Sequence, residues 1–142
     1  MNIDLRIKKV SKNAKVPDQP YDGDAGFDLY STGTVSIEPG KKAAIGTGIA
    51  LAIPKGFVGL IWDKSGIAIK HGLKTLGGVV DSGYRGEVMV GIINHSDKPY
   101  IFEEGDKVAQ MLIQEVVLPK IVEVEELDET QRGDKKFGSS GK

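Results

Sequence analysis

Short runs of β-branched residues recur along the chain, each closed by Gly, Pro, Asp or Ser, and this pattern most restricts the possible fold. In one run Ile49, Leu51 and Ile53 alternate with alanines, which is the period of a strand with one buried face. The 13 Val and 14 Ile outnumber the nine Leu, so the apolar residues favour strands over a helical bundle. The predicted strands cover residues 2–10, 34–37, 43–53, 57–62, 87–94, 108–117 and 121–127.

This regular spacing in a chain of 142 residues predicts one all-β domain, a sandwich or a barrel, over residues 1–127. The one helix expected is a turn or two over residues 65–71, where Ser65 is a candidate cap. Residues 11–25, rich in Pro, Asp and Gly, are predicted to form a loop. Residues 128–142 hold one apolar residue, Phe137, among Gly, Ser and charges, so we expect a mobile arm without a core.

Charge and composition exclude several classes of protein. The 19 Lys and Arg nearly balance the 20 Asp and Glu, so the basic footprint of a duplex-binding protein is missing and no nucleic-acid polymer is expected as a partner. The absence of Cys excludes disulfides, thiolate metal sites and Cys nucleophiles. No uncharged apolar run approaches about 18 residues. We therefore expect no membrane partner and a cytoplasmic protein, with a nuclear or viral origin left open.

The common catalytic and phosphate-binding motifs are also missing. His71 and His95 lie 24 residues apart without a third ligand in view, so neither is expected to bind metal or act as a base. No GxSxG, GxxxxGK[ST] or strand-following GxGxxG motif occurs. What remains are polar clusters beside glycines, any one of which turn chemistry alone would explain. These clusters are DAGFDLYS (24–31), WDKSGIAIKHG (62–72), GGVVDSGYRGEV (77–88) and EEGDKVAQML (103–112).

Two of these clusters combine groups with a definite chemistry. In the second, Lys64 is followed by a hydroxyl and a Gly amide, a combination that could hold an oxyanion through charge, side chain and backbone. In the third, Asp81 and Tyr84 lie in a Gly-rich turn between two apolar runs, which is typical of a hairpin.

Taken in order, five segments resemble the five motifs of the trimeric dUTP diphosphatases (dUTPases): residues 24–31, 63–73, 78–96, 105–116 and 132–141. The resemblance implies an all-β, jelly-roll-like barrel or sandwich of the β-clip type, with one short helix and a flexible C-terminal arm that closes over an active site. It implies a homotrimer with active sites at subunit interfaces. The implied reaction is hydrolysis of dUTP to dUMP and pyrophosphate with Mg²⁺, which limits uracil incorporation into DNA and supplies dUMP for thymidylate synthesis.

By position in these motifs, the resemblance assigns the base that orients and deprotonates the attacking water to Asp81. An anionic nucleophile that approaches a polyanion needs such a positioned acceptor. The ring of Tyr84 is implied to pack beneath the deoxyribose and to exclude a 2′-hydroxyl. Backbone groups are implied to read the uracil edge at Gly78, Val79, Val80 and Met89.

The phosphates are implied to contact Lys64, Ser65 and Gly66, with Gln110 contributed by a neighbouring subunit. Asp63 and Lys64 stand where the family usually has Pro-Arg, so Lys64 keeps the charge but loses the bidentate fork. Asp63 could pair with Lys64 or simply end the strand. Lys107 similarly replaces a common Arg.

Magnesium is implied to be held mainly by the three phosphates and water, with Asp28 supporting the site and the metal's water shell. In the arm, Phe137 is implied to stack on the uracil and Arg132 to reach the γ-phosphate. Gly138 and Ser139 are implied to add backbone and hydroxyl contacts.

Two other readings stay open at the sequence level. The dCTP deaminases are similar in fold and in the third motif, but they carry a catalytic Glu where this chain has Gly91, and usually an Arg where it has Ile69. A nucleotide-binding regulator that has lost turnover is the alternative from a different class.

Overall fold

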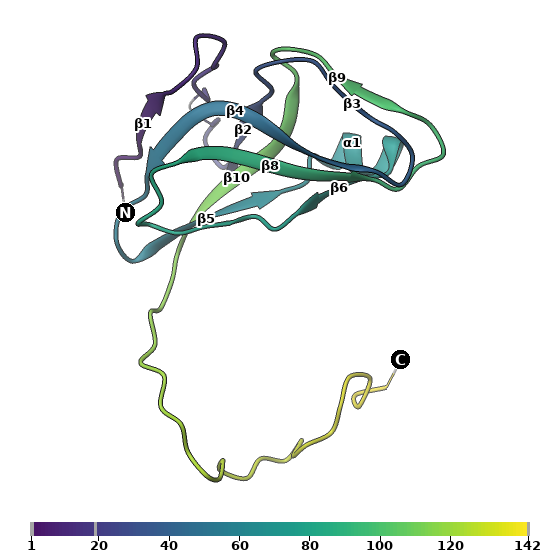
Figure 1. Cartoon of the computed structure of the whole chain (residues 1–142). Coiled ribbons are helices and arrows are strands. Elements are labelled where there is room, and N and C mark those ends of the chain that lie inside the picture. Colours follow the sequence, from purple (N-terminus) through teal and green to yellow (C-terminus); the bar gives the residue numbers. More distant parts are fainter. Residues whose placement is uncertain (1, 19, 142) are drawn as a thin grey trace.

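The computed structural model describes residues 2–18 and 20–141, and its strands form two four-stranded antiparallel sheets and one two-stranded pair (Figure 1). The first sheet has the order β1 (Arg6–Lys9), β4 (Lys42–Ala52), β8 (Glu87–Asn94), β6 (Leu73–Leu76). The second has the order β2 (Gly26–Tyr30), β10 (Lys107–Glu115), β5 (Phe57–Trp62), β7 (Val79–Val80). The separate pair is β3 (Val35–Ile37) and β9 (Tyr100–Phe102), and α1 (Ser65–His71) follows β5. The predicted all-β, jelly-roll-like fold with one short helix is confirmed for the described residues.

The core lies between the two sheets and follows from the alternation along their strands. On β8 Val88, Val90 and Ile92 are buried, while the residues between them are more exposed. They belong to the same cluster as Leu29 of β2 and Met111 of β10. Each sheet therefore buries the face on which its β-branched and apolar side chains gather.

The predicted strand at residues 121–127 is wrong for the single chain. Residues 116–141 form no helix or strand, and Figure 1 shows them running away from the two sheets. A strand needs a neighbour for its backbone hydrogen bonds, and the chain's own described residues supply none to this segment. Its alternating pattern is real, but the apolar side chains stay exposed, with Ile121 at 89% and Leu127 at 84%.

The predicted hairpin over residues 77–88 is also wrong. β7 pairs with β5 in the second sheet, whereas β8 pairs with β4 and β6 in the first. The Gly-rich turn after Val80 therefore carries the chain from one sheet to the other. Its local geometry is still that of a turn, because the Tyr84 amide donates to the Asp81 carbonyl at 3.0 Å.

The helix α1 has the predicted bounds, Ser65–His71, but not the predicted cap. Lys64, not Ser65, occupies the cap position, and no side chain caps the helix there. At the other end Gly72 adopts φ 66°, and its amide donates to the Ala68 carbonyl at 3.0 Å. A left-handed glycine of this kind is a common helix end.

Four strands were not among those predicted, namely β2, β6, β7 and β9. They have two to five residues each, too few to show a period. Within the described part of the chain, no helix is long and apolar enough to cross a membrane.

Candidate active site

A cavity of about 210 Å³ lies where β5, β7 and β8 meet the turn that joins the two sheets. Its walls carry most of the residues that the third motif predicted to recognise a nucleoside. The lining residues are Ile61, Gly78, Val79, Val80, Asp81, Tyr84, Val88 and Met89. The exposed carboxylate of Asp81 and the half-exposed ring of Tyr84 thus share one small cavity.

The backbone of β7 is available at this cavity because β7 is the edge strand of its sheet. An edge strand uses the amides and carbonyls of one side in the sheet and leaves those of the other side unpaired by it. Gly78 makes the close approach possible: its carbonyl accepts from the Ile61 amide at 2.8 Å. It has φ +111°, and an added Cβ would lie 2.9 Å from the Ile61 carbonyl oxygen, so a larger residue does not fit.

A second group of predicted residues gathers around Asp28, beside the C-terminal end of β5. Lys64 Nζ lies 2.6 Å from Asp28 Oδ1, and Lys107 Nζ lies 3.0 Å from Oδ2. The sheet explains this grouping, because Gln110 of β10 pairs with Asp28 on one side and with Trp62 on the other. The register of three strands therefore brings residues of three sequence motifs to one place.

The two lysines determine the charge state of Asp28. Partial burial raises the pKa of its carboxyl, but the hydrogen bonds and charges of Lys64 and Lys107 outweigh that effect and hold the pKa below its ordinary value. In return, the hydrogen bond and charge of Asp28 raise the pKa of Lys107. Asp28 is thus ionised between two ammonium groups at neutral pH.

The structure settles the part that Asp63 plays. Its Oδ1 accepts from both the amide and the hydroxyl of Thr75, each at 2.8 Å, and Oδ2 lies 3.0 Å from Lys74 Nζ. Burial raises the pKa of Asp63, but these hydrogen bonds and the Lys74 charge hold it below its ordinary value. Asp63 therefore fastens the end of β5 to β6 and does not pair with Lys64.

Gln110 adds a second fastening at the same point. Its Nε2 donates to the Asp63 carbonyl at 2.8 Å within the same chain. The loop that begins α1 is thereby tied to β6 and to β10. Ser65 and Gly66 follow at the exposed start of the helix, where the first-turn amides have no partner in the helix. Lys64, the Ser65 hydroxyl and these amides form a group suited to phosphate oxygens.

The two groups do not share one cavity in the single chain. None of residues 63–66, nor Gln110, lines the cavity of Asp81 and Tyr84. The predicted arm residues lie apart from both groups, at the end of the extended segment in Figure 1. Arg132 donates to the carbonyls of Lys135 and Lys136, at 3.3 and 3.4 Å, and Phe137 is fully exposed. Gly138 and Ser139 are exposed beside it.

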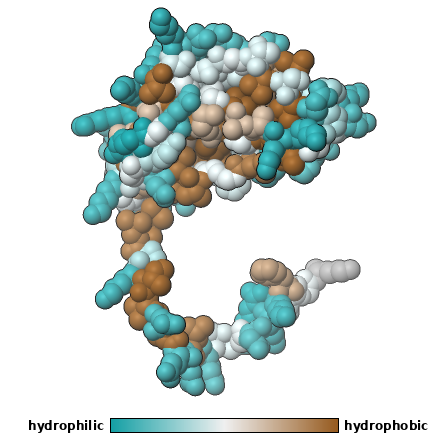
Figure 2. Space-filling model, in the orientation of Figure 1, coloured by the Kyte–Doolittle hydropathy of each residue, from teal (hydrophilic) through white to brown (hydrophobic). Residues whose placement is uncertain are grey.

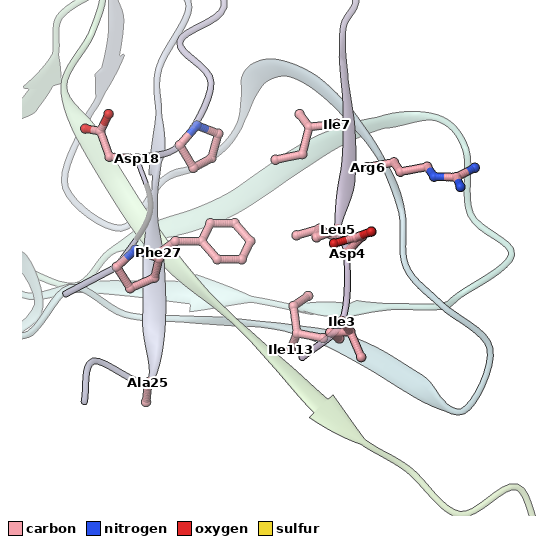
Figure 3. Close-up of a pocket in the computed structure, with 11 residues that line it drawn as sticks. Ile3, Asp4, Leu5, Arg6, Ile7, Asp18, Ala25, Phe27 and Ile113 are labelled. Atoms are coloured by element: carbon pink, nitrogen blue, oxygen red, sulfur yellow. The ribbon is translucent and has the colours of Figure 1, made fainter. Parts of the chain in front are cut away.

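A larger cavity, of about 640 Å³, lies between the N-terminal segment and strands β2 and β10 (Figure 3). Its labelled side chains come from residues 3–7, from the following loop, and from Phe27 and Ile113. They are mainly apolar, and none is a predicted site residue. The larger cavity is therefore not the site that the sequence predicted.

Several residues that shape the site were not predicted from the sequence. Thr75 and Lys74 lie on β6, a strand that was not predicted, so no signal indicated them. Gly86 and Glu87 lie inside the third cluster, and the Tyr84 hydroxyl donates to the Glu87 carbonyl at 2.8 Å. The sequence shows Glu87 close to Tyr84, but only the folded turn shows that the Glu87 carbonyl accepts the hydrogen bond from the tyrosine.

Fold and site together define a class of protein: an all-β protein with a small cavity beside an edge strand and a separate group of lysines and helix amides around Asp28. The chain belongs to the dUTPase family, whose model matches residues 12–141. It is 46% identical over 143 residues to the deoxyuridine 5′-triphosphate nucleotidohydrolase of Rhodococcus erythropolis, covering 99% of this chain and 87% of the relative. The enzyme of the same name from Clostridium tetani is 45% identical over 140 residues, which are 97% of each chain.

Solved structures agree with this assignment. The dUTPase of Staphylococcus bacteriophage 80alpha, solved with dUpNHpp, superposes with a TM-score of 0.91 at 34% identity, over 99% of both chains. A variant of the dUTPase from phage phi11 of S. aureus, described with a structural Mg(II) ion, gives a TM-score of 0.83 at 31% identity, over 89% of this chain and all of the other.

Proposed function

We propose that the chain hydrolyses dUTP to dUMP and pyrophosphate through attack of water on the α-phosphorus. The observation that carries this proposal is the cavity in which Asp81, Tyr84 and the edge backbone of β7 meet. It offers a proton acceptor, a ring for a sugar and unpaired backbone groups for a base within about 210 Å³. This combination fits a family whose members are named for dUTP hydrolysis.

In this proposal Asp81 takes a proton from the attacking water and orients it. The Tyr84 ring packs beneath the deoxyribose and leaves no room for a 2′-hydroxyl. Backbone groups of Gly78, Val79 and Val80, with Met89 opposite, read the edge of the uracil. Because Asp81 is exposed, it can reach a water molecule at the mouth of the cavity.

The triphosphate lies toward the second group of residues. Lys64 neutralises phosphate charge, while the Ser65 hydroxyl and the amides that begin with Gly66 donate to phosphate oxygens. Gln110 takes part from the same group, although its amide already donates to Asp63 in the single chain. The hydrogen bonds from Thr75 to Asp63 hold this loop against β6.

Magnesium fits this site as an ion that is bound together with the triphosphate of the substrate. In the described part of the chain no three His, Asp or Glu residues lie together in a way that could hold a metal ion. Both oxygens of Asp28 are already engaged by lysines, though each keeps a lone pair for a metal-bound water. When bound with the triphosphate, Mg²⁺ shields its negative charge and fixes its conformation.

We further propose that the enzyme is a homotrimer with shared sites. Two observations support an assembly. Residues 63–66 and Gln110 do not line the cavity of Asp81 and Tyr84 in one chain, so a complete site calls for a neighbour. The segment after β10 also carries exposed apolar side chains, including Val117, Leu118 and Ile121. Figure 2 shows hydrophobic residues in brown along the part of the segment that leaves the body.

The domain division expected from the sequence belongs to the same proposal. Residues 1–127 form the β subunit with its connecting segment, and residues 128–142 form an arm that closes over a loaded site. Closure would place Phe137 on the uracil and bring Arg132, Gly138 and Ser139 to the phosphates. In this proposal the reaction takes place in the cytoplasm, where it would limit uracil incorporation into DNA and supply dUMP for thymidylate synthesis.

Nucleotide hydrolysis by the full-length protein with Mg²⁺ tests this function. We expect pyrophosphate release from dUTP and little from dCTP, dTTP or UTP. Ammonia release from dCTP would identify a deaminase instead. Nucleotide binding without either product would identify a regulator that has lost turnover.

A further inference from the structure

Gly86 lies directly beneath the edge of the Tyr84 ring. A Cβ added at Gly86 would lie 2.6 Å from the Tyr84 hydroxyl oxygen, 2.8 Å from Cζ and 3.2 Å from Cε2. Two of these separations are shorter than van der Waals contact allows, and the 2.8 Å contact is with a ring atom. Any side chain at position 86 therefore moves the ring from its present place.

The observed reason for glycine at this position is the ring. Gly86 is not among the described glycines with positive φ, so a left-handed backbone conformation does not call for glycine here. Gly83, three residues earlier in the same turn, also lacks a positive φ, and a Cβ added there meets nothing within 4 Å. Gly83 and Gly86 thus both lack a positive φ, but an added side chain would contact the Tyr84 ring only at Gly86.

The hydroxyl of the Tyr84 ring is held by Glu87, which belongs to β8 of the first sheet. The Tyr84 hydroxyl donates to the Glu87 carbonyl at 2.8 Å, and the Glu87 carboxylate accepts from the Gly48 amide at 2.8 Å. Gly48 lies in β4 where the register with β8 shifts, between Gly46 and Ala50. It has φ +67° and is closely packed, since an added Cβ would lie 2.7 Å from Thr32 Cγ2. The acceptor of the Tyr84 hydroxyl is thus fixed to a crowded, irregular part of the sheet.

We propose that Gly86 and the Glu87 carbonyl form a seat for Tyr84, and that this seat determines how strictly the cavity selects deoxyribose over ribose. The inference rests on the proposed function, because it deepens the recognition of dUTP at the same site. Gly86 acts through Tyr84 and is a positioning residue. Since Tyr84 is 46% exposed, a displaced ring can swing toward solvent and open the wall that would exclude a 2′-hydroxyl.

The test compares Gly86→Ala with Gly83→Ala in the full-length protein, with kcat/KM measured for dUTP and for UTP. We expect Gly86→Ala to lower the ratio of the two values by about tenfold or more, the scale on which a misplaced wall changes selection of a small group. Gly83→Ala is expected to leave the ratio within about twofold, as for an ordinary surface substitution. A ratio unchanged in Gly86→Ala overturns the proposal.

A double-mutant cycle separates the seat from a general disturbance of the turn. In a Tyr84→Ala background no ring remains to be displaced, so Gly86→Ala should change the ratio no further. A full additional loss in that background would contradict the proposal. Tyr84→Phe, which keeps the ring but loses the Glu87 hydrogen bond, tests the seat without a new side chain at position 86. We expect an intermediate fall in the ratio, and an unchanged ratio would exclude the Glu87 carbonyl as part of the seat.

The wild-type protein distinguishes failure of this inference from failure of the proposed function. If it releases no pyrophosphate from dUTP, the function fails, and the seat is then read from a crystal structure of Gly86→Ala. A Tyr84 ring that has left the Glu87 carbonyl supports the seat. A ring in its original place overturns it.

Discussion

At the scale of single residues, the structure shows the partners of two carboxylates, Asp28 and Asp63. Asp28 lies between Lys64 and Lys107, and Asp63 is bound by Thr75 and Lys74. The pKa of each lies below its ordinary value. A carboxyl whose pKa is lower in the folded than in the unfolded chain stabilises the fold when ionised and loses that contribution as it is protonated.

The lowered pKa values of Asp28 and Asp63 predict how the free energy of unfolding changes at acidic pH. In the unfolded chain an Asp titrates near about 3.9, so their contribution is complete above about pH 5 and is lost as pH falls through the lower folded pKa values. Urea denaturation at a series of pH values should show stability falling below about pH 5. The fall should be smaller in Asp28→Asn, whose amide does not titrate. A variant that retains the whole pH dependence would show that Asp28 does not contribute to it.

The role of Asp81 leads to a kinetic prediction. Asp81→Asn keeps the shape of the side chain but removes the proton acceptor, so kcat for dUTP should fall by at least about 100-fold. The affinity for dUTP, measured by calorimetry, should stay within about tenfold of wild type because no binding contact is lost. Turnover above about a tenth of wild type would remove Asp81 from the proposed mechanism.

At the scale of elements, the arm after residue 127 has a composition that cannot build a core, and it lies outside both sheets. Truncation after Thr130 should therefore leave thermal stability almost unchanged. The rate of dUTP hydrolysis should fall by about tenfold or more, because the proposed closure of the arm and the Arg132 charge are lost together. Phe137→Ala should give a milder loss, since stacking on a base is worth about 1–3 kcal/mol. Full activity of the truncated protein would contradict an arm that closes over the site.

At the scale of the whole molecule, light scattering should report a mass near three times 15.2 kDa. Truncation after Glu115, at the end of β10, should weaken this assembly, whereas truncation after Thr130 should not. The difference follows from residues 116–127, whose exposed apolar side chains have no place to be buried in one chain. A fully active monomer would exclude sites shared between subunits.

The sequence by itself determined the kind of fold and indicated residues that the structure brings together. Strand alternation repeats every two residues and short apolar runs end at turn residues, so β8 and β5 could be predicted with the bounds that the structure shows. Motif order likewise indicated the cluster that holds Asp81 and Tyr84. Both signals are local, because they need no knowledge of which strands pair.

Tertiary structure alone decided the pairing. Whether the turn after Val80 closes a hairpin or crosses between sheets depends on β5 and β4, far away in the sequence. The partner of Asp63 lies on a four-residue strand too short to show a period, and the alternating segment at residues 121–127 found no neighbour in its own chain. The need for glycine at position 86 arises where the Tyr84 ring comes to rest. Each of these depends on contacts whose geometry is fixed only when the two sheets have packed together, and no local pattern encodes that geometry.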